Sequence, residues 1–174
     1  MADRRLTGLL LVGGASTRFG SPKALALLGG ETLAERAWRL LGEVCDERIA
    51  VGKGELELPF EVLHDGSDVR APIVGLVAGL RAAAHEIAVA IPVDMPQLTA
   101  NALRALADAC RDVAVAQRGP LPGAYRKTAL PALERALALQ QLSLRDAISN
   151  LDVARIELED GELANVNTPA DVQL

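Results

Sequence analysis

Short apolar runs alternate with longer amphipathic segments along this chain. The runs at residues 7–12 and 87–92 are almost continuously apolar, too short for a typical helix, and followed by Gly or Asp. That pattern is typical of strands buried on both faces of a sheet. The segments between such runs have helix-like patterns. The alternation predicts a βαβ architecture built on a mostly parallel sheet.

The remaining elements follow from the same pattern and from capping signals. Thr32 and Glu35 have the spacing of a capping box, Thr99 can cap the helix that follows it, and Pro72 can open a helix. Further strands are predicted at residues 48–51, 60–63, 113–116 and 153–158. Helices are predicted at residues 32–44, 72–84, 99–110, 129–139 and 143–151, with a last short turn capped by Thr168.

Composition limits the classes of protein to which the chain can belong. Its 174 residues, 50% of them hydrophobic, predict one domain spanning residues 1–174. A net charge of −5 argues against a nucleic-acid binder. No apolar run approaches the ~20 residues of a membrane span and no signal peptide is visible, so we expect a cytoplasmic protein without a membrane partner. Cys45 and Cys110 have no metal-ligand spacing.

The first apolar run ends in a glycine-rich loop with the pattern Gly-Gly-x-Ser-x-Arg-x-Gly-x-x-Lys at residues 13–23. The pattern matches neither the P-loop nor the dinucleotide fingerprint. Backbone N–H groups of such a loop can bind phosphate oxygens, and Arg18 and Lys23 can neutralise a triphosphate. Lysine is scarce in this chain, with only three residues, which favours a functional Lys23 over a plain strand–helix loop with surface charges.

A carboxylate follows the second long apolar run at Asp94-Met95-Pro96. If both runs are parallel strands, Asp94 lies at the same sheet edge as the glycine-rich loop. A carboxylate there can hold Mg²⁺ against phosphate oxygens. The alternative for Asp94 is a turn or helix-capping role.

Two further polar clusters carry candidate functional residues. Asp65 leaves a short strand and can contact a base or ribose, or it can form a turn before Gly66. Asn165 and Asn167 can hydrogen-bond phosphate or metal-bound water, or they can belong to a helix start capped by Thr168.

These motifs, in this order, resemble the nucleotidyltransferases of molybdenum cofactor synthesis, and among them the guanylyl branch. The resemblance covers nearly the whole chain and implies a three-layer α/β/α sandwich with a mostly parallel, Rossmann-like sheet of the nucleotide-diphospho-sugar transferase type. The motifs that carry it are the loop at residues 13–23, Ala-Pro-Ile-Val-Gly-Leu at 71–76, Asp-Met-Pro at 94–96, Leu-Pro-Gly-Ala-Tyr-Arg at 121–126, Ser-Leu-Arg at 143–145 and Asn-Val-Asn-Thr-Pro at 165–169.

The resemblance implies roles for individual residues. The family's catalytic positions match Arg18, Lys23 and Asp94, with Arg18 and Lys23 at phosphate-contacting positions and Asp94 as the ligand of the cofactor Mg²⁺. The nucleotide-binding positions match Leu11, Val12, Gly13, Gly14, Ser16 and Asp65 besides those three, and the pterin phosphate side matches Asn165 and Asn167. Where the family often has Asn at the second strand exit, this chain has Gly52, which removes one expected contact.

The implied reaction transfers GMP from GTP to the terminal phosphate of molybdopterin-bound molybdenum and releases pyrophosphate. The implied partners are these two substrates, together with proteins that deliver or receive the cofactor. Pro22, where the family often has Asp, leaves two relatives as alternatives: a CTP-dependent molybdopterin transferase and a sugar-phosphate nucleotidyltransferase. A non-catalytic nucleotide-binding domain is the alternative from another class.

Overall fold

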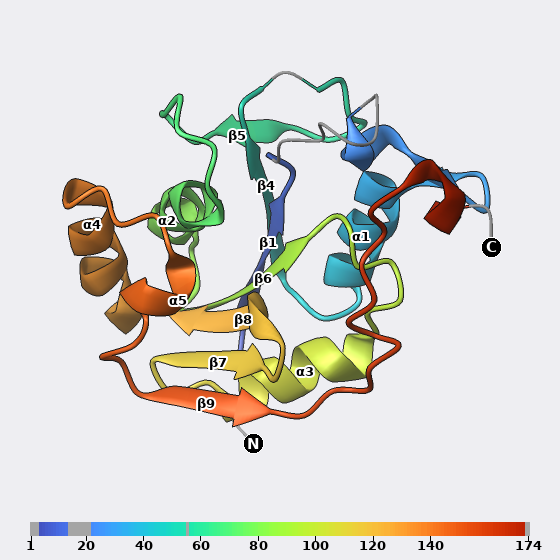
Figure 1. Cartoon of the computed structure of the whole chain (residues 1–174). Coiled ribbons are helices and arrows are strands. Elements are labelled where there is room, and N and C mark those ends of the chain that lie inside the picture. The colour runs from blue at the N-terminus through green and yellow to red at the C-terminus, as the bar shows by residue number, and fades with distance from the viewer. Residues whose placement is uncertain (1–3, 14–21, 55, 173–174) are drawn as a thin grey trace.

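A seven-stranded sheet forms the centre of the molecule, with the strand order β5-β4-β1-β6-β8-β7-β9 (Figure 1). This computed structural model describes residues 4–13, 22–54 and 56–172. The strands are β1 (Leu6–Leu11), β4 (Glu47–Gly52), β5 (Val62–His64), β6 (Ile87–Pro92), β7 (Val113–Ala116), β8 (Gly119–Arg126) and β9 (Val153–Ile156). Only β8 among them runs against the others, so the carboxyl ends of the other six meet at one edge.

Helices cover both faces of this sheet. The face with α1 (Leu33–Gly42) and α3 (Ala100–Ala109) lies opposite the face with α2 (Pro72–Ala82), α4 (Leu130–Ala138) and α5 (Leu144–Ala147), as Figure 1 shows. The predicted α/β sandwich with a mostly parallel, Rossmann-like sheet is therefore confirmed. A short hairpin of β2 (Leu27–Leu28) and β3 (Glu31–Thr32) precedes α1. The remaining elements in the described residues are the 3-10 turns η1 (Lys23–Leu25), η2 (Lys127–Ala129) and η3 (Pro169–Val172).

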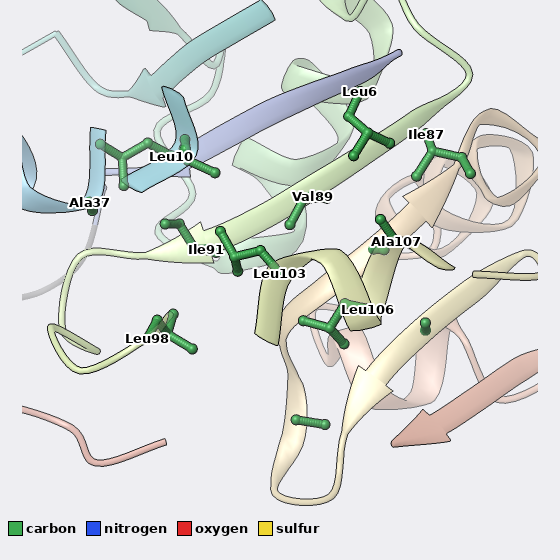
Figure 2. Close-up of a cluster of buried hydrophobic side chains, with 14 of the residues drawn as sticks. Leu6, Leu10, Ala37, Ile87, Val89, Ile91, Leu98, Leu103, Leu106 and Ala107 are labelled. Carbon is green, nitrogen blue, oxygen red and sulfur yellow. The ribbon is translucent and has the colours of Figure 1, made fainter. Parts of the chain in front are cut away.

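Alternation along the central strands divides the core into two layers. Leu10 of β1 and Val89 and Ile91 of β6 pack with α1 and α3, the cluster shown in Figure 2. Leu9 of β1 and Ala90 of β6 pack with α2 and α4 on the other face. All five side chains are buried, as expected for strands that are covered on both sides.

Glycine allows helix α2 to pack directly against strands β1 and β4. A Cβ added to Gly79 would lie 2.9 Å from Leu9 Cδ1 and 3.3 Å from Val51 Cγ2. Gly79 lowers the helix propensity of α2, and the close contact with the sheet is the reason for its presence.

Strand β8, like the short β2–β3 hairpin, is an element that the hydrophobic pattern missed. It contains two prolines and two glycines, and the Leu121–Pro122 peptide bond is cis, whereas strands are expected to be poor in both residues. Partners on both sides stabilise it, because β6 and β7 both pair with it. The buried Tyr125 hydroxyl also donates a hydrogen bond to the Pro120 carbonyl.

The predicted helix starts are confirmed at the two clearest caps. Thr32 and Glu35 form a complete capping box on α1, and the Thr99 side chain accepts a hydrogen bond from the Ala102 backbone N–H at the start of α3. The predicted helix at 143–151 is wrong in length, since α5 spans only four residues and the chain then turns. Within the described parts of the chain, no helix combines the length and apolarity required to cross a membrane.

Candidate active site

The carboxyl edge of the sheet brings together strand ends that are far apart in sequence. Val12 directly follows strand β1, and its backbone N–H donates to the Val51 carbonyl of β4. Strand β5 lies next along the edge, and the Asp65 N–H that follows it donates to the Gly52 carbonyl. On the other side of β1, strand β6 delivers Asp94. The predicted meeting of the glycine-rich loop's strand with Asp94 at one edge is thus confirmed.

Lys23 and Asp94 form an ion pair at this edge. Lys23 Nζ lies 3.4 Å from Asp94 Oδ2, and their side chains are 20% and 24% exposed. The pair is therefore close enough to interact and open enough to meet a ligand. Asp171 belongs to the same region: backbone N–H groups of Asn167 and Thr168, and to a smaller extent the Lys23 charge, hold its pKa below the ordinary value.

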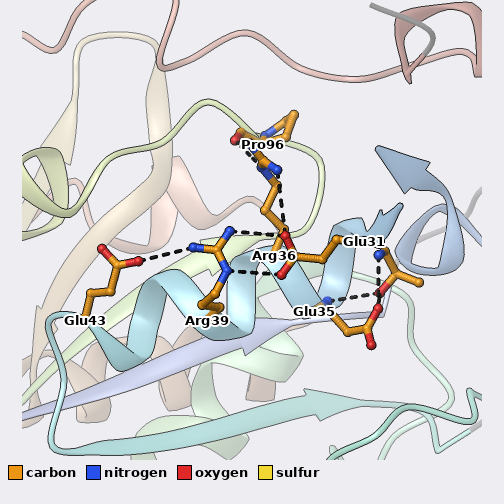
Figure 3. Close-up of polar contacts among 7 residues, drawn as sticks. Glu31, Glu35, Arg36, Arg39, Glu43 and Pro96 are labelled. Carbon is orange, nitrogen blue, oxygen red and sulfur yellow. Dashed lines mark hydrogen bonds and ion pairs between the residues drawn. The ribbon is translucent and has the colours of Figure 1, made fainter. Parts of the chain in front are cut away.

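The turn that carries Asp94 is held from two directions. From α1, the Arg36 side chain donates to the Pro96 carbonyl at 3.1 Å. Glu31 forms ion pairs with both Arg36 and Arg39 (Figure 3). From the C-terminal segment, the Val166 N–H donates to the Asp94 carbonyl at 2.8 Å. Because Val166 is itself buried, this bond fixes Asn165 and Asn167, on either side of it, beside the Asp94 turn.

A pocket of about 480 Å³ opens next to that turn. Met95, Asn165 and Asn167 are among the residues that line it. Its remaining lining comes from Leu163 and from the β7–β8 hairpin, which contributes Arg118, Gly119, Pro120 and Leu121. The two asparagines singled out in the sequence thus share a pocket with an arginine that the sequence pattern did not single out.

Two hydrogen-bonded links hold that hairpin against the segment after β9. The Gln117 side-chain amide donates to the Leu158 carbonyl and accepts from the Leu158 N–H. Arg118 pairs with Asp160 at 2.7 Å, with side chains 52% and 78% exposed. The guanidinium therefore sits at the pocket in a solvated ion pair that a stronger anionic ligand can replace.

Asp65 lies at the other end of the edge and is bound to Lys53. Lys53 Nζ lies 2.8 Å from Asp65 Oδ2, with side chains only 9% and 5% exposed. The sequence offers Asp65 either as a nucleotide contact or as a turn former, and the Asp65 carboxylate does accept from the Ser67 N–H in a local turn. Lys53 is not singled out by the sequence motifs. The scarcity of lysine, already used for Lys23, was the signal that could have found it.

A family model described as the MobA-like NTP transferase domain matches residues 8–155, which include most of β1, all of β6 and the strand ends described above. The chain belongs to this family.

Named relatives match nearly the whole chain. A protein of Rhodopirellula baltica named probable molybdenum cofactor guanylyltransferase is 31% identical, covering 96% of this chain and 90% of its own. A Deinococcus radiodurans protein of the same name is 35% identical, with 96% and 92% covered. The fold is also that of a solved structure, molybdopterin-guanine dinucleotide biosynthesis protein A from Archaeoglobus fulgidus, with a TM-score of 0.81 at 23% identity, covering 96% and 95% of the two chains.

Not every residue that the family resemblance singles out can be placed. Gly14, Ser16 and Arg18 lie outside the described residues. Leu11, Val12 and Gly13 are described at the end of β1, where Gly13 adjoins Gly52. Of the family's phosphate-contacting positions, Lys23 is therefore the one that the structure locates.

The donor set at the edge suits a cation that is shared with a ligand. Within the described residues, no three acidic, histidine or cysteine side chains cluster as a metal site. Asp94 offers a single carboxylate beside the predicted triphosphate loop. Mg²⁺ is commonly bound in this way, by one or two carboxylates plus substrate phosphates, so the residues present fit that ion.

Proposed function

We propose that this protein transfers GMP from GTP to the terminal phosphate of molybdopterin-type molybdenum cofactor, releasing pyrophosphate. Membership of the NTP transferase family supports the reaction class. Relatives of similar length that carry the name molybdenum cofactor guanylyltransferase support the nucleotide and the acceptor.

One structural observation supports the proposal above the others: the Val166 N–H bond to the Asp94 carbonyl. It joins the turn that carries the candidate catalytic carboxylate to the segment that carries Asn165 and Asn167. A group transfer needs donor and acceptor sites that share a border. Asp94 lies between the glycine-rich loop's strand and the pocket at Asn165, as such a border requires.

The proposed reaction does not require the protein to transfer a proton. In the proposed step, a phosphate oxygen of the acceptor forms a bond to the α-phosphorus of GTP as the bond to the bridging oxygen breaks, and pyrophosphate leaves with that oxygen. The attacking group is already an anion, so no general base is required. The barrier lies in bringing two polyanions together in line, and Lys23 would lower it by neutralising phosphate charge.

Asp94 would also hold Mg²⁺ against the triphosphate, and that ion, when bound, stabilises negative charge on the phosphate oxygens. The acceptor would enter the pocket beside Met95. There, Asn165 and Asn167 can donate to its phosphate, and Arg118 can exchange its solvated bond to Asp160 for a charge-assisted bond to the same group.

The proposal is tested with purified protein and the four nucleoside triphosphates. Thermal stabilisation by each nucleotide with Mg²⁺ reports binding, and pyrophosphate release with and without molybdopterin reports transfer. We expect the largest stabilisation with GTP, and pyrophosphate release only when the acceptor is present. A preference for CTP, or no release with any acceptor, would contradict the proposal.

A further inference from the structure

Lys53 is a nearly buried cation to which the proposed reaction assigns no role. Its Nζ lies 2.8 Å from Asp65 Oδ2, 2.9 Å from Asp65 Oδ1, and 2.6 Å from the carbonyl oxygens of both Ser67 and Val69. An ammonium group has three hydrogens to donate. All of these acceptors belong to the loop at residues 65–69, so every hydrogen that Lys53 Nζ can donate is bound by that loop.

The loop at residues 65–69 also binds itself through short side chain–backbone bonds. Asp65 Oδ1 accepts from the Ser67 N–H, and the Ser67 hydroxyl accepts from the Val69 N–H. His64 Nδ1 accepts from the N–H of Gly66, whose φ of 75° suits glycine. These bonds form local turns, and the ammonium group of Lys53 connects them because it contacts Asp65, Ser67 and Val69 at once.

The position of this loop gives the arrangement a functional meaning. It starts beside Gly52, where the Asp65 N–H donates to the Gly52 carbonyl. Gly52 in turn adjoins Gly13: a Cβ on Gly13 would lie 3.6 Å from the Gly52 Cα. The loop therefore borders the end of β1, where the triphosphate loop begins.

Position 52 contributes no side chain to this border, and it is crowded by Val12. A Cβ on Gly52 would lie 2.7 Å from Val12 Cγ2 and 3.5 Å from the Gly13 backbone nitrogen. The first of these distances is too short for a real Cβ contact, so a side chain at position 52 would require Val12 to shift. Polar recognition on this side of β1 must then come from elsewhere, and the loop at residues 65–69 is the next segment along the edge.

We propose that Lys53 is a positioning residue for the nucleotide: it holds the loop at residues 65–69 as a preformed wall whose remaining backbone groups bind the nucleoside part of the triphosphate. This inference rests on the proposed function. Asp65 then acts as the partner that neutralises Lys53, and the loop rather than the carboxylate meets the nucleoside. A loop ordered before binding loses little conformational entropy when the ligand arrives.

The test compares Lys53→Met with Lys127→Met. Lys127 follows β8 near the opposite edge, where its N–H donates to the Glu86 carbonyl, so it controls for loss of a lysine. We expect Lys53→Met to weaken GTP binding, measured by calorimetry, and to raise the KM for GTP about tenfold, with kcat and the acceptor KM within about twofold of wild type. Lys127→Met should change none of these.

A second set of variants covers the case in which Lys53→Met does not fold, since it leaves the buried Asp65 unpaired. Lys53→Gln combined with Asp65→Asn keeps a neutral hydrogen-bonding pair of similar shape. We expect this double variant to fold and still to bind GTP more weakly. Amide hydrogen exchange in residues 65–69 should be faster in each Lys53 variant.

Different outcomes separate this inference from the proposed function. If every Lys53 variant binds GTP as wild type does, or if kcat and both KM values fall or rise together with stability, Lys53 is only structural and the inference is wrong. If wild type binds GTP through a Lys53-dependent loop but transfers nothing to molybdopterin, the inference stands and the proposed function fails. If wild type binds no nucleotide, both are wrong.

Discussion

The two ends of the carboxyl edge are built in opposite ways. At the end proposed to bind the nucleotide (the nucleotide end), Lys53 and Asp65 form a nearly buried pair with every donor of the ammonium group used, near Gly52, which packs against Val12. At the end proposed to take the acceptor (the acceptor end), Arg118 and Asp160 form an exposed pair beside a pocket of about 480 Å³. A buried pair fixes a surface before binding, whereas an exposed pair contributes little stability and can exchange partners. We infer that the nucleotide end is preformed and that the acceptor end adapts.

The largest expected effect comes from the residue between the two ends. Asp94→Asn removes the carboxylate charge but keeps the size of the side chain, so the fold should survive. We expect kcat to fall about a thousandfold, in the range seen when an electrostatic contact to the transition state is lost. Pyrophosphate release under saturating substrates measures it.

Asp108→Asn, on the exposed face of α3, is the matched control and should retain full activity. An Asp94→Asn enzyme with near-normal kcat would show that Asp94 is not the catalytic carboxylate between the two ends.

A smaller effect, confined to the KM for the acceptor, is expected when Arg118 is replaced. Arg118→Met should raise the acceptor KM about tenfold, because a charge-assisted contact to phosphate is lost, and should leave the KM for GTP unchanged. Steady-state kinetics with each substrate varied in turn separates the two constants.

Arg145→Met on α5 is the control, since that exposed arginine lies on an element away from the pocket. The comparison would break if Arg118→Met changed the GTP constant instead, because the two ends would then not be separable.

Packing beneath the nucleotide end provides a third prediction, on stability. Gly79→Val places methyl groups where a Cβ alone is already 2.9 Å from Leu9, so we expect a loss of about 1–3 kcal/mol in the free energy of unfolding. Urea denaturation measures this loss. Gly161→Ala, with no atom within 4 Å of its added Cβ, should be close to neutral, and equal effects of the two changes would contradict the close packing of α2 on β1.

The last prediction concerns chemical reactivity rather than activity or stability, at Cys45 on the amino edge, where the sulfur would lie 3.2 Å from a Cβ on Gly8. Burial raises the pKa of the Cys45 thiol from 9.0 to about 12. The thiolate is the reactive form, and a raised pKa keeps the folded thiol protonated as pH rises through 9. Alkylation at pH 8 should therefore be at least about a hundredfold slower than for a free thiol.

Mass spectrometry of the alkylated protein, native and urea-unfolded, checks this. Rapid native labelling of Cys45 would show that the amino edge opens more readily than its burial implies.

The sequence pattern predicted the scaffold well where local and tertiary preferences agree. Strands β1 and β6 are apolar on both faces and are covered on both faces, and the caps at Thr32 and Thr99 form as expected. It failed at β8, whose prolines and glycines argue against a strand, because pairing with β6 and β7 outweighs local propensity.

The candidate site shows the same limit. Asp94 was predictable because it follows a buried strand, and a parallel sheet brings such residues to one edge. The pairings of Lys53 and Arg118 were not predictable, since their partners Asp65 and Asp160 lie more than ten and more than forty residues away in sequence. The local pattern of hydrophobic and polar residues carries no information on contacts so distant in sequence.

The most direct test of the central claim is a competition in one reaction. The purified protein receives equal GTP and CTP, molybdopterin-bound molybdenum and Mg²⁺, and the dinucleotide product is identified by its mass. The account predicts the guanine dinucleotide as the dominant product, with one pyrophosphate released for each molecule formed. A cytosine dinucleotide in excess, or pyrophosphate without either dinucleotide, would contradict it.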